Sequence, residues 1–280
     1  MDRGRESSVW PGVLLVLAML LWASSFIALK LAFESYHPMV VIFGRMLVAA
    51  VCFLFLAKRL GGSQWRPGDL KYLAFMVMCE PCLYFLFEAQ AVRNTTASQA
   101  GMVTAMLPLL VAVAASAVLH EKVTRRTLSG FALAIVGVCI LSASGSASAS
   151  APHPALGNFL EFVAMVCATG YNITLKKLTE RYSPLFLTAL QAFVGAIFYL
   201  PFLFLTGVGL PGEFHLVPAL SILYLGVFVT LGAYGLYQWP ELLLALAALP
   251  LMAQVMMGVR GAVVVSAAAL GIVLVLPLGA

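Results

Sequence analysis

Three features of the sequence predict an all-α integral membrane protein, with ten transmembrane helices arranged as two inverted five-helix repeats. The 280 residues are 62% hydrophobic and 10% charged, with a mean hydropathy of +1.02. A soluble core of this length does not need so much apolar surface, so most of the chain must face lipid or other helices. The other two features are a series of ten apolar runs and an internal repeat.

The repeat relates Ala18–Ala50 to Ala164–Ala196, at a constant shift of 146 positions. Within it the frame Lys-x3-Glu-x-Tyr-x-Pro begins at Lys30 and again at Lys176. Polar residues that are scarce in this chain are not expected to recur in order by chance, so we interpret the match as a duplicated unit. In so apolar a chain, two related halves are typical of transporters with a central binding site.

The first half contains five runs long enough to cross a bilayer. They are Val13–Leu31, Val40–Ala57, Tyr72–Ala91, Ser98–Val118 and Thr127–Ala143. Arg3 and Arg5 precede the first run, as in signal peptides. The run is about 19 residues long and more spans follow, so we expect an uncleaved first helix.

A low-complexity segment rich in Ser and Ala, Ser142–Pro154, separates the halves and is predicted to be flexible. We therefore expect a first repeat at 10–143, a linker at 144–156 and a second repeat at 157–278. The runs of the second half are Gly157–Leu175, Pro184–Leu205, Val217–Tyr237, Glu241–Met257 and Ala262–Leu278.

Positive charges in the loops predict the orientation. The loops that ten spans place on one side carry twelve Lys and Arg residues, whereas the opposite loops carry only Arg93 and Arg260. Both termini are therefore expected in the cytoplasm. Because each half has an odd number of spans, the second half enters the membrane inverted relative to the first.

Several classes of function are disfavoured. The basic residues that give the net charge of +5 lie in short loops, where they set orientation and do not form a nucleic-acid surface. The five cysteines are odd in number and lie inside apolar runs, so no disulfide framework is indicated. The four histidines lie in separate loops, and Cys79 and Cys82 have no nearby His. We expect no catalytic site, no metal and no cofactor.

The third span carries the most informative polar residues. Glu80, Tyr84 and Glu88 recur every four residues, so a regular helix would place them along one face, with the carboxyl groups about 12 Å apart. Pro81 is predicted to kink this helix and to free carbonyl groups toward a cavity. Charged groups at this depth usually face a cavity or a partner, which favours a proton site or a site for a substrate ammonium group. The alternative is a neutral Glu80 that hydrogen-bonds a neighbouring helix.

Further candidates are polar or aromatic residues within the spans. Lys30 and Arg45 could bind anionic groups of a substrate or pair with acidic side chains, and snorkelling to the interface is the alternative. Gln191 is the counterpart of Arg45, which argues against a symmetric anion clamp. Gly101 and Gly130 belong to small-residue stripes that we expect to let helices approach closely. The remaining candidate site residues are Trp22, Ser25, Thr104, Asn172, Tyr234, Gln238 and Trp239.

Two stretches carry a family resemblance: LLWASSFIALKLAFESYHPMVVIFGRMLVAA, and ASQAGMVTAMLPLL followed by HEKVTRRTLSGFALAIVGVCIL. They resemble the EamA-type drug/metabolite transporters, whose half-repeat has similar residues at the positions of Trp22, Lys30, Pro38, Arg45, Pro108, Glu121, Gly130 and Gly137. The resemblance implies ten helices, export or exchange of small metabolites, and a bacterial inner membrane as the location.

The resemblance ends at about Trp239. The interval from Glu88 to Pro108 is 20 positions, whereas that from Gln238 to Pro250 is 12. A diverged paralogue and a reading-frame change near the 3' end of the coding sequence would both produce this departure.

We therefore expect a secondary transporter of small organic metabolites, with a small-molecule substrate, a lipid environment, protons as a candidate coupling ion and a homodimer as a candidate assembly. Two alternatives stay open. One is a non-transporting membrane receptor or assembly subunit, and the other is an organellar-type exchanger of phosphorylated sugars.

Overall fold

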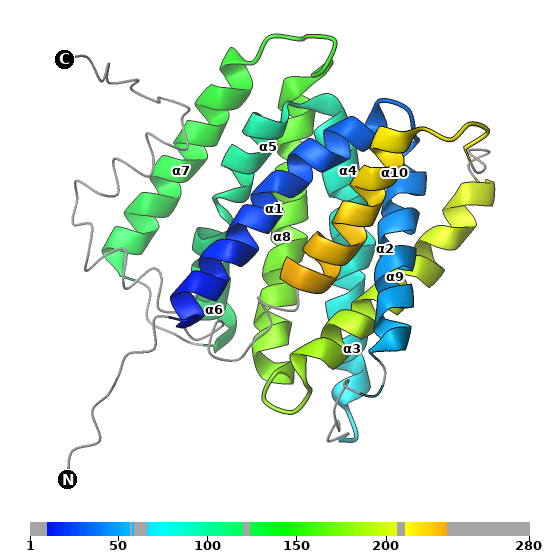
Figure 1. The fold of residues 1–280 in the computed structure, drawn as a ribbon. Coiled ribbons are helices and arrows are strands. Elements are labelled where there is room, and N and C mark those ends of the chain that lie inside the picture. Colours follow the sequence, from blue (N-terminus) through cyan, green and yellow to red (C-terminus); the bar gives the residue numbers. More distant parts are fainter. Residues whose placement is uncertain (1–9, 57, 59–65, 120–123, 206–210, 234–280) are drawn as a thin grey trace, which may run out of the picture. The chain divides into compact units, whose positions relative to one another are not determined.

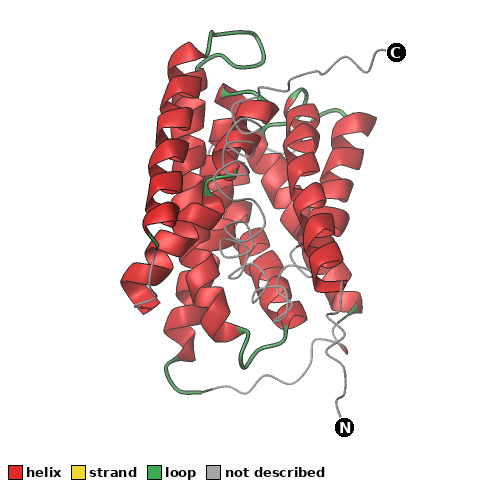
Figure 2. Cartoon of the chain, turned by 90° about the vertical axis from the view of Figure 1, so that its left-hand side faces the viewer, coloured by secondary structure: helices red, strands yellow, loops and turns green. Residues whose placement is uncertain are grey.

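A computed structural model describes residues 10–56, 58, 66–119, 124–205 and 211–233 (Figure 1). Within these ranges the elements are helices, without a β-strand (Figure 2). Seven stretches of the described chain are helical, long and apolar enough to cross a membrane. The prediction of an all-helical, multi-pass membrane protein is confirmed. The number ten is not, since the predicted spans Glu241–Met257 and Ala262–Leu278 lie outside the described residues.

The helices follow the predicted runs in order. They are α1 (Trp10–Phe33), α2 (Pro38–Phe55), α3 (Asp69–Val77), α4 (Tyr84–Asn94), α5 (Ala97–Thr104), α6 (Leu107–Leu119), α7 (Arg125–Ser144), α8 (Pro154–Leu178), α9 (Pro184–Leu205) and α10 (Leu216–Tyr224). Two π-helical segments, Met78–Leu83 and Leu225–Ala233, follow α3 and α10. Side-chain caps begin several of the helices: for example, Thr96 accepts from the amide of Gln99, and Thr124 from that of Thr127.

The chain divides into two compact units. Unit 1 comprises the described residues within 10–82 and 174–233, and unit 2 comprises the described residues within 83–173. Each unit therefore contains segments of both predicted halves. The segment predicted as a linker lies within unit 2 and joins α7 to α8.

Unit 1 is built on α2, which packs along α9, and on α1, which packs against α10 and Leu225–Ala233. A cluster of buried residues joins α2 to α9: Ala49, Ala50, Phe53, Ala189 and Ala192. Four of these five side chains are alanines, which let the two helix backbones approach closely around one aromatic ring.

The shift of 146 positions also relates elements of the described structure. It maps the first residue of α2 onto the first residue of α9, and the starts of α3 and of Met78–Leu83 to within one residue of those of α10 and Leu225–Ala233. In both halves, therefore, a helix of nine residues runs into a π-helical segment at the same point of the repeat.

Unit 2 contains α4 to α7 and most of α8. α5 contacts α4 and α7, and α7 contacts α6. The start of α8 is fixed by Asn158, which accepts from the Thr95 hydroxyl at 2.8 Å and donates to Ser142 at 3.1 Å. In the apolar span formed by α7, only 6% of the residues are buried, as expected of a helix that faces lipid.

Candidate functional site

The third predicted span is interrupted at Glu80. The backbone of Glu80 is extended, with φ −149° and ψ 118°. Glu80 lies inside the π-helical segment Met78–Leu83, which also contains Pro81. The kink predicted at Pro81 is thus present, as a break in the regular helix. The expectation that Glu80, Tyr84 and Glu88 share one helix face is wrong for Glu80, because the regular helix resumes only at Tyr84. Glu80 is nevertheless buried, with 4% of its surface exposed.

The break exposes backbone carbonyl groups to side chains of α9. Gln191 donates from Nε2 to the carbonyl of Glu80 at 3.3 Å. The Tyr199 hydroxyl donates to the carbonyl of Pro81 at 3.1 Å and also contacts that of Cys82. Both side chains are buried, so the polar groups released by the break are satisfied inside the protein. Gln191 was predicted as a candidate, whereas Tyr199 was not.

A related arrangement occurs at the second π-helical segment. Arg45 of α2 is 2% exposed and donates to the Thr230 hydroxyl within Leu225–Ala233 at 3.5 Å. Thr230 itself donates to the carbonyl of Leu225 at 3.0 Å, a bond over five residues. Arg45 and Gln191 are related by the 146-residue shift. Each therefore reaches the π-helical segment of the other predicted half.

Two glycines lie where these helices cross. A Cβ at Gly195 would lie 2.7 Å from Met46 Sδ and 2.9 Å from Pro81 Cγ. A Cβ at Gly226 would lie 2.6 Å from Val48 and 2.9 Å from the carbonyl of Arg45. These two positions require glycine for close approach of the helices.

The predicted close approach at Gly101 and Gly130 is not found. Apart from the chain neighbours and the backbone of the same helix, no atom of the described residues lies within 4 Å of a Cβ built at either position. Small residues in an apolar run are compatible with close packing but do not require it.

Unit 2 brings together a second group of candidates. The Tyr84 hydroxyl donates to Glu88 Oε1 at 2.8 Å, as the four-residue spacing predicts. Thr104 donates to Glu161 Oε1 on α8, also at 2.8 Å. Glu161 is completely buried. Glu161 was missed, although an acidic residue inside the apolar run Gly157–Leu175 was a signal for it.

Glu161 belongs to a polar stripe along α8. Asn158, Glu161, Thr169 and Asn172 are all buried, and their successive spacings of 3, 8 and 3 residues place them on one helix face. Asn172 was a candidate. Its side chain donates to the carbonyl of Ala168 at 2.7 Å, within the same helix.

The other predicted site residues lie on α1 or outside the described residues. Ser25 is buried and donates to the carbonyl of Trp22 at 2.6 Å, a local bond within α1. Trp22 and Lys30 are half-buried on the same helix. Three candidates, Tyr234, Gln238 and Trp239, lie outside the described residues.

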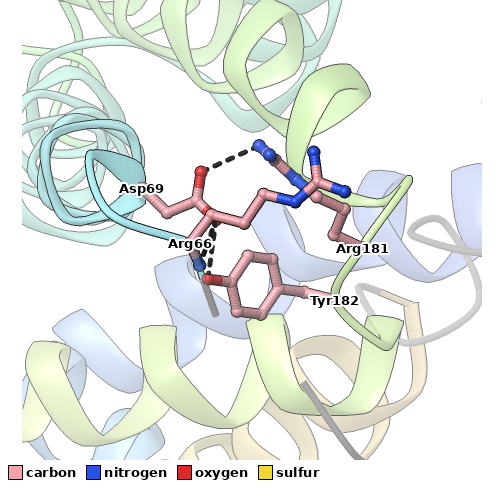
Figure 3. A network of polar contacts seen from close by, with 4 residues as sticks. All are labelled: Arg66, Asp69, Arg181 and Tyr182. Carbon is pink, nitrogen blue, oxygen red and sulfur yellow. Dashed lines mark hydrogen bonds and ion pairs between the residues drawn. The ribbon is translucent and has the colours of Figure 1, made fainter. Parts of the chain in front are cut away.

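A polar network in unit 1 surrounds Asp69, the first residue of α3 (Figure 3). Arg181 forms an ion pair with its carboxylate at 2.8 Å, Tyr182 donates to it at 3.1 Å, and the backbone N–H of Arg66 donates to it at 3.3 Å. Burial raises the pKa of the Tyr182 phenol, as does its bond to Asp69, so the phenol remains a donor at neutral pH. Three donors on one carboxylate connect the loop before α3 to the loop before α9.

Comparisons with known proteins agree with the sequence resemblance. The EamA-like transporter family matches residues 10–143 and 155–240. The second match ends where the departure after Trp239 was predicted.

Individual proteins extend the similarity. An uncharacterized transporter of Archaeoglobus fulgidus is 26% identical over 233 residues, which are 81% of this chain and 78% of that protein. A probable terminal-alkyne amino-acid exporter of Streptantibioticus cattleyicolor is 25% identical over 84% of this chain and 75% of its own. One solved structure, described as the crystal structure of a protein, is 16% identical with a TM-score of 0.58, and the match covers 96% of this chain and 95% of the other. At that identity the likeness concerns the fold alone.

Proposed function

Because the chain belongs to the EamA-like transporter family, we propose that it is a secondary carrier that exports small organic metabolites, such as amino acids, by alternating access. It is a multi-pass membrane protein, and its family and the amino-acid exporter among its relatives make transport its general activity. The substrate class, the mechanism and the direction are our proposal.

The observation that carries the proposal is the pair of interrupted helices. Carriers built from inverted repeats bind solutes where membrane helices are discontinuous. Backbone groups that lack a helical hydrogen bond there can bind a ligand or change from one hydrogen-bond partner to another. Here Met78–Leu83 and Leu225–Ala233 occupy equivalent points of the repeat. Each is contacted by a buried polar residue, Gln191 or Arg45, that is itself repeat-related.

The inverted arrangement and the location are part of the proposal. The excess of Lys and Arg on one set of loops supports cytoplasmic termini and an inner-membrane location. Under this orientation the network around Asp69 lies at the cytoplasmic end, since Arg66 and Arg181 belong to the basic loops. We propose that this network closes the cytoplasmic side in one state of the cycle.

Proton coupling through Glu80 extends the proposal. Glu80 is buried at the break, and a carboxyl group in that position can bind and release a proton as the surrounding helices rearrange. Glu80→Gln keeps the size of the side chain but cannot titrate. We expect a normally inserted protein with lost or pH-independent transport. Flux that retains the wild-type pH profile in the Gln variant would remove Glu80 from the coupling mechanism.

The experiment is a flux assay with the full-length protein in liposomes. A panel of labelled amino acids and related metabolites is loaded inside, and efflux is followed with and without a pH gradient, from about pH 5.5 to 8.5. Saturable efflux of at least one solute, compared with protein-free liposomes, supports a carrier. The receptor or assembly-subunit alternative predicts no flux for any solute, and the phosphorylated-sugar exchanger predicts flux only with sugar phosphates.

A further inference from the structure

Two lysines from different helices of unit 1 approach the same aromatic ring. Lys71 Nζ lies 5.1 Å from the centroid of the Tyr72 ring, and Lys177 Nζ lies 3.9 Å from it. The two nitrogens cannot be further apart than these two distances together, a separation shorter than the Debye length of about 10 Å at 0.1 M salt. The two positive charges therefore repel each other, and an anion beside the ring relieves that repulsion.

The charges of these two lysines are available to an external anion. Asp69, the acidic residue closest to Lys71 along the chain, is already paired with Arg181 at 2.8 Å. Among the described residues, neither Lys71 nor Lys177 forms an ion pair, and both are exposed. An ammonium group has three N–H donors, so contact with the ring leaves donors for the oxygens of an anion.

The two lysines lie at helix ends. Lys71 and Tyr72 are in the first turn of α3, which begins the apolar span Asp69–Asn94, and Lys177 is in the last turn of α8. Tyrosines and lysines at the end of a span are typical of the membrane–water interface, where lipid headgroups lie. The orientation proposed above places this end at the cytoplasmic leaflet, which carries anionic lipids.

The exposed face of α3 continues from this cationic end into apolar side chains. Phe75 is 52% exposed and Met78 is 47% exposed. They follow Lys71 by four and seven residues, so the three side chains share one helix face. A free phosphate ion would leave the apolar part of this face uncovered, whereas a phospholipid carries its acyl chains directly below its headgroup.

We propose that Lys71 and Lys177 bind the headgroup phosphate of an anionic phospholipid, with its acyl chains along Phe75 and Met78. Basic sites between helices at the cytoplasmic end of membrane spans have the chemistry that binds such headgroups. The inference goes beyond the proposed function, because it does not depend on whether the chain transports a solute.

Native mass spectrometry of the full-length protein in a nonionic detergent tests the site. The protein is titrated with palmitoyl-oleoyl phosphatidylglycerol or with the zwitterionic phosphatidylcholine that has the same acyl chains. The apparent dissociation constant of the first bound lipid is measured for each. A cationic side chain at the membrane surface favours an anionic lipid about fivefold, so two should give phosphatidylglycerol a preference of roughly 25-fold.

Variants assign the preference to the two lysines. Lys71→Gln and Lys177→Gln should each reduce it to about fivefold, and the double variant should abolish it. Lys177→Arg keeps the charge beside the ring and should keep the preference. Arg93→Gln is the matched control, because it removes one exposed charge near the opposite end of the same span and should leave the preference unchanged.

Three results with these proteins would overturn the inference: equal affinity for the two lipids, a wild-type preference in the folded double variant, or a loss in Arg93→Gln as large as that in Lys177→Gln. The last result would mean that the basic protein attracts anionic lipid without a defined site. Inorganic phosphate at millimolar concentration distinguishes a lipid from a free anion. We expect phosphatidylglycerol to remain bound, and its displacement by phosphate would assign the two lysines to a soluble anion and contradict the lipid site.

Discussion

Tyr182 donates a hydrogen bond to Asp69, and Tyr36 accepts one from the backbone N–H of His215 at 2.9 Å. The shift of 146 positions maps Tyr36 onto Tyr182 and Asp69 onto His215. The repeat therefore relates the two contacts to each other. In each, a buried tyrosine from the loop after the first helix of one half holds the start of the third helix of the other. The proposed inverted topology predicts that they lie at opposite ends of the membrane.

The first prediction concerns this pair of tyrosines. Tyr182→Phe removes the donor to Asp69 and keeps the ring, so it should cost about 1 kcal/mol of local stability. Backbone amides at the start of α3 should then exchange with deuterium roughly fivefold faster. Tyr36→Phe should act in the same way at the start of α10. Hydrogen–deuterium exchange read by mass spectrometry measures both segments in each variant.

Each variant is the control for the other. Tyr182→Phe should leave the start of α10 unchanged, and Tyr36→Phe should leave the start of α3 unchanged. Faster deuterium exchange at the starts of both α3 and α10 in either variant would contradict the prediction that the two contacts act separately.

The second prediction concerns the charge of Asp69. This carboxylate is 4% exposed and accepts from Arg66, Arg181 and Tyr182, so Asp69→Asn weakens several charge-assisted bonds together. We expect a loss of about 2 kcal/mol in the free energy of unfolding, measured with urea in detergent micelles.

The exposed pair of Glu213 and His215, 3.9 Å apart, provides the comparison. Glu213→Gln removes the same charge from a side chain that is 87% exposed, and should change stability by less than about 0.5 kcal/mol. If Asp69→Asn and Glu213→Gln lost equal free energy of unfolding, burial of the Asp69 network would add nothing to stability.

Much of the fold follows from periodicity and composition. Apolar runs of span length predicted the described helices, and the repeat that contains the Tyr-x-Pro frame predicted two related halves; α2 and α9 begin at the equivalent prolines of that frame, although the run of α2 was predicted to begin at Val40. Apolar runs are local features, and the repeat is a comparison of the sequence with itself, so both can be read from the sequence alone. Contacts such as Arg181–Asp69 depend on which loops meet in three dimensions, and no spacing in the sequence specifies that.

The candidate site was predicted less completely. Arg45, Gln191, Glu88, Tyr84 and Thr104 were identified because polar side chains inside apolar runs are costly and need partners. The placement of Glu80 was wrong because four-residue spacing assumes a continuous helix, and the backbone at Glu80 is extended. Tyr199 was missed because its partners are backbone carbonyl groups. Every residue has one, and only the break in the helix makes these carbonyl groups available to a side chain.

The third prediction tests the close crossing at Gly226. An added Cβ would lie 2.6 Å from Val48 and 2.9 Å from the carbonyl of Arg45, so Gly226→Ala must push two helices apart. We expect a loss of about 1 to 3 kcal/mol in the free energy of unfolding and a weakened Arg45–Thr230 contact. Gly101→Ala is the control, because nothing in the described chain lies near the added methyl group. A Gly226→Ala protein as stable as Gly101→Ala would contradict the close crossing.

The last prediction concerns Tyr199 and Pro81. The Tyr199 hydroxyl satisfies carbonyl groups that the break at Pro81 leaves outside the helical pattern. Tyr199→Phe should therefore cost about 1 to 3 kcal/mol, because those buried acceptors lose their donor. Pro81→Ala restores a backbone N–H, which should make the helix more regular and slow transport without preventing insertion. In a more regular helix the amides of Phe85 and Leu86 can donate to the carbonyl groups of residues 81 and 82, so in the double variant the added cost of Tyr199→Phe should fall by about 1 kcal/mol. Unfolding measurements on the four proteins form a double-mutant cycle, and strictly additive losses would show that Tyr199 does not act through the break.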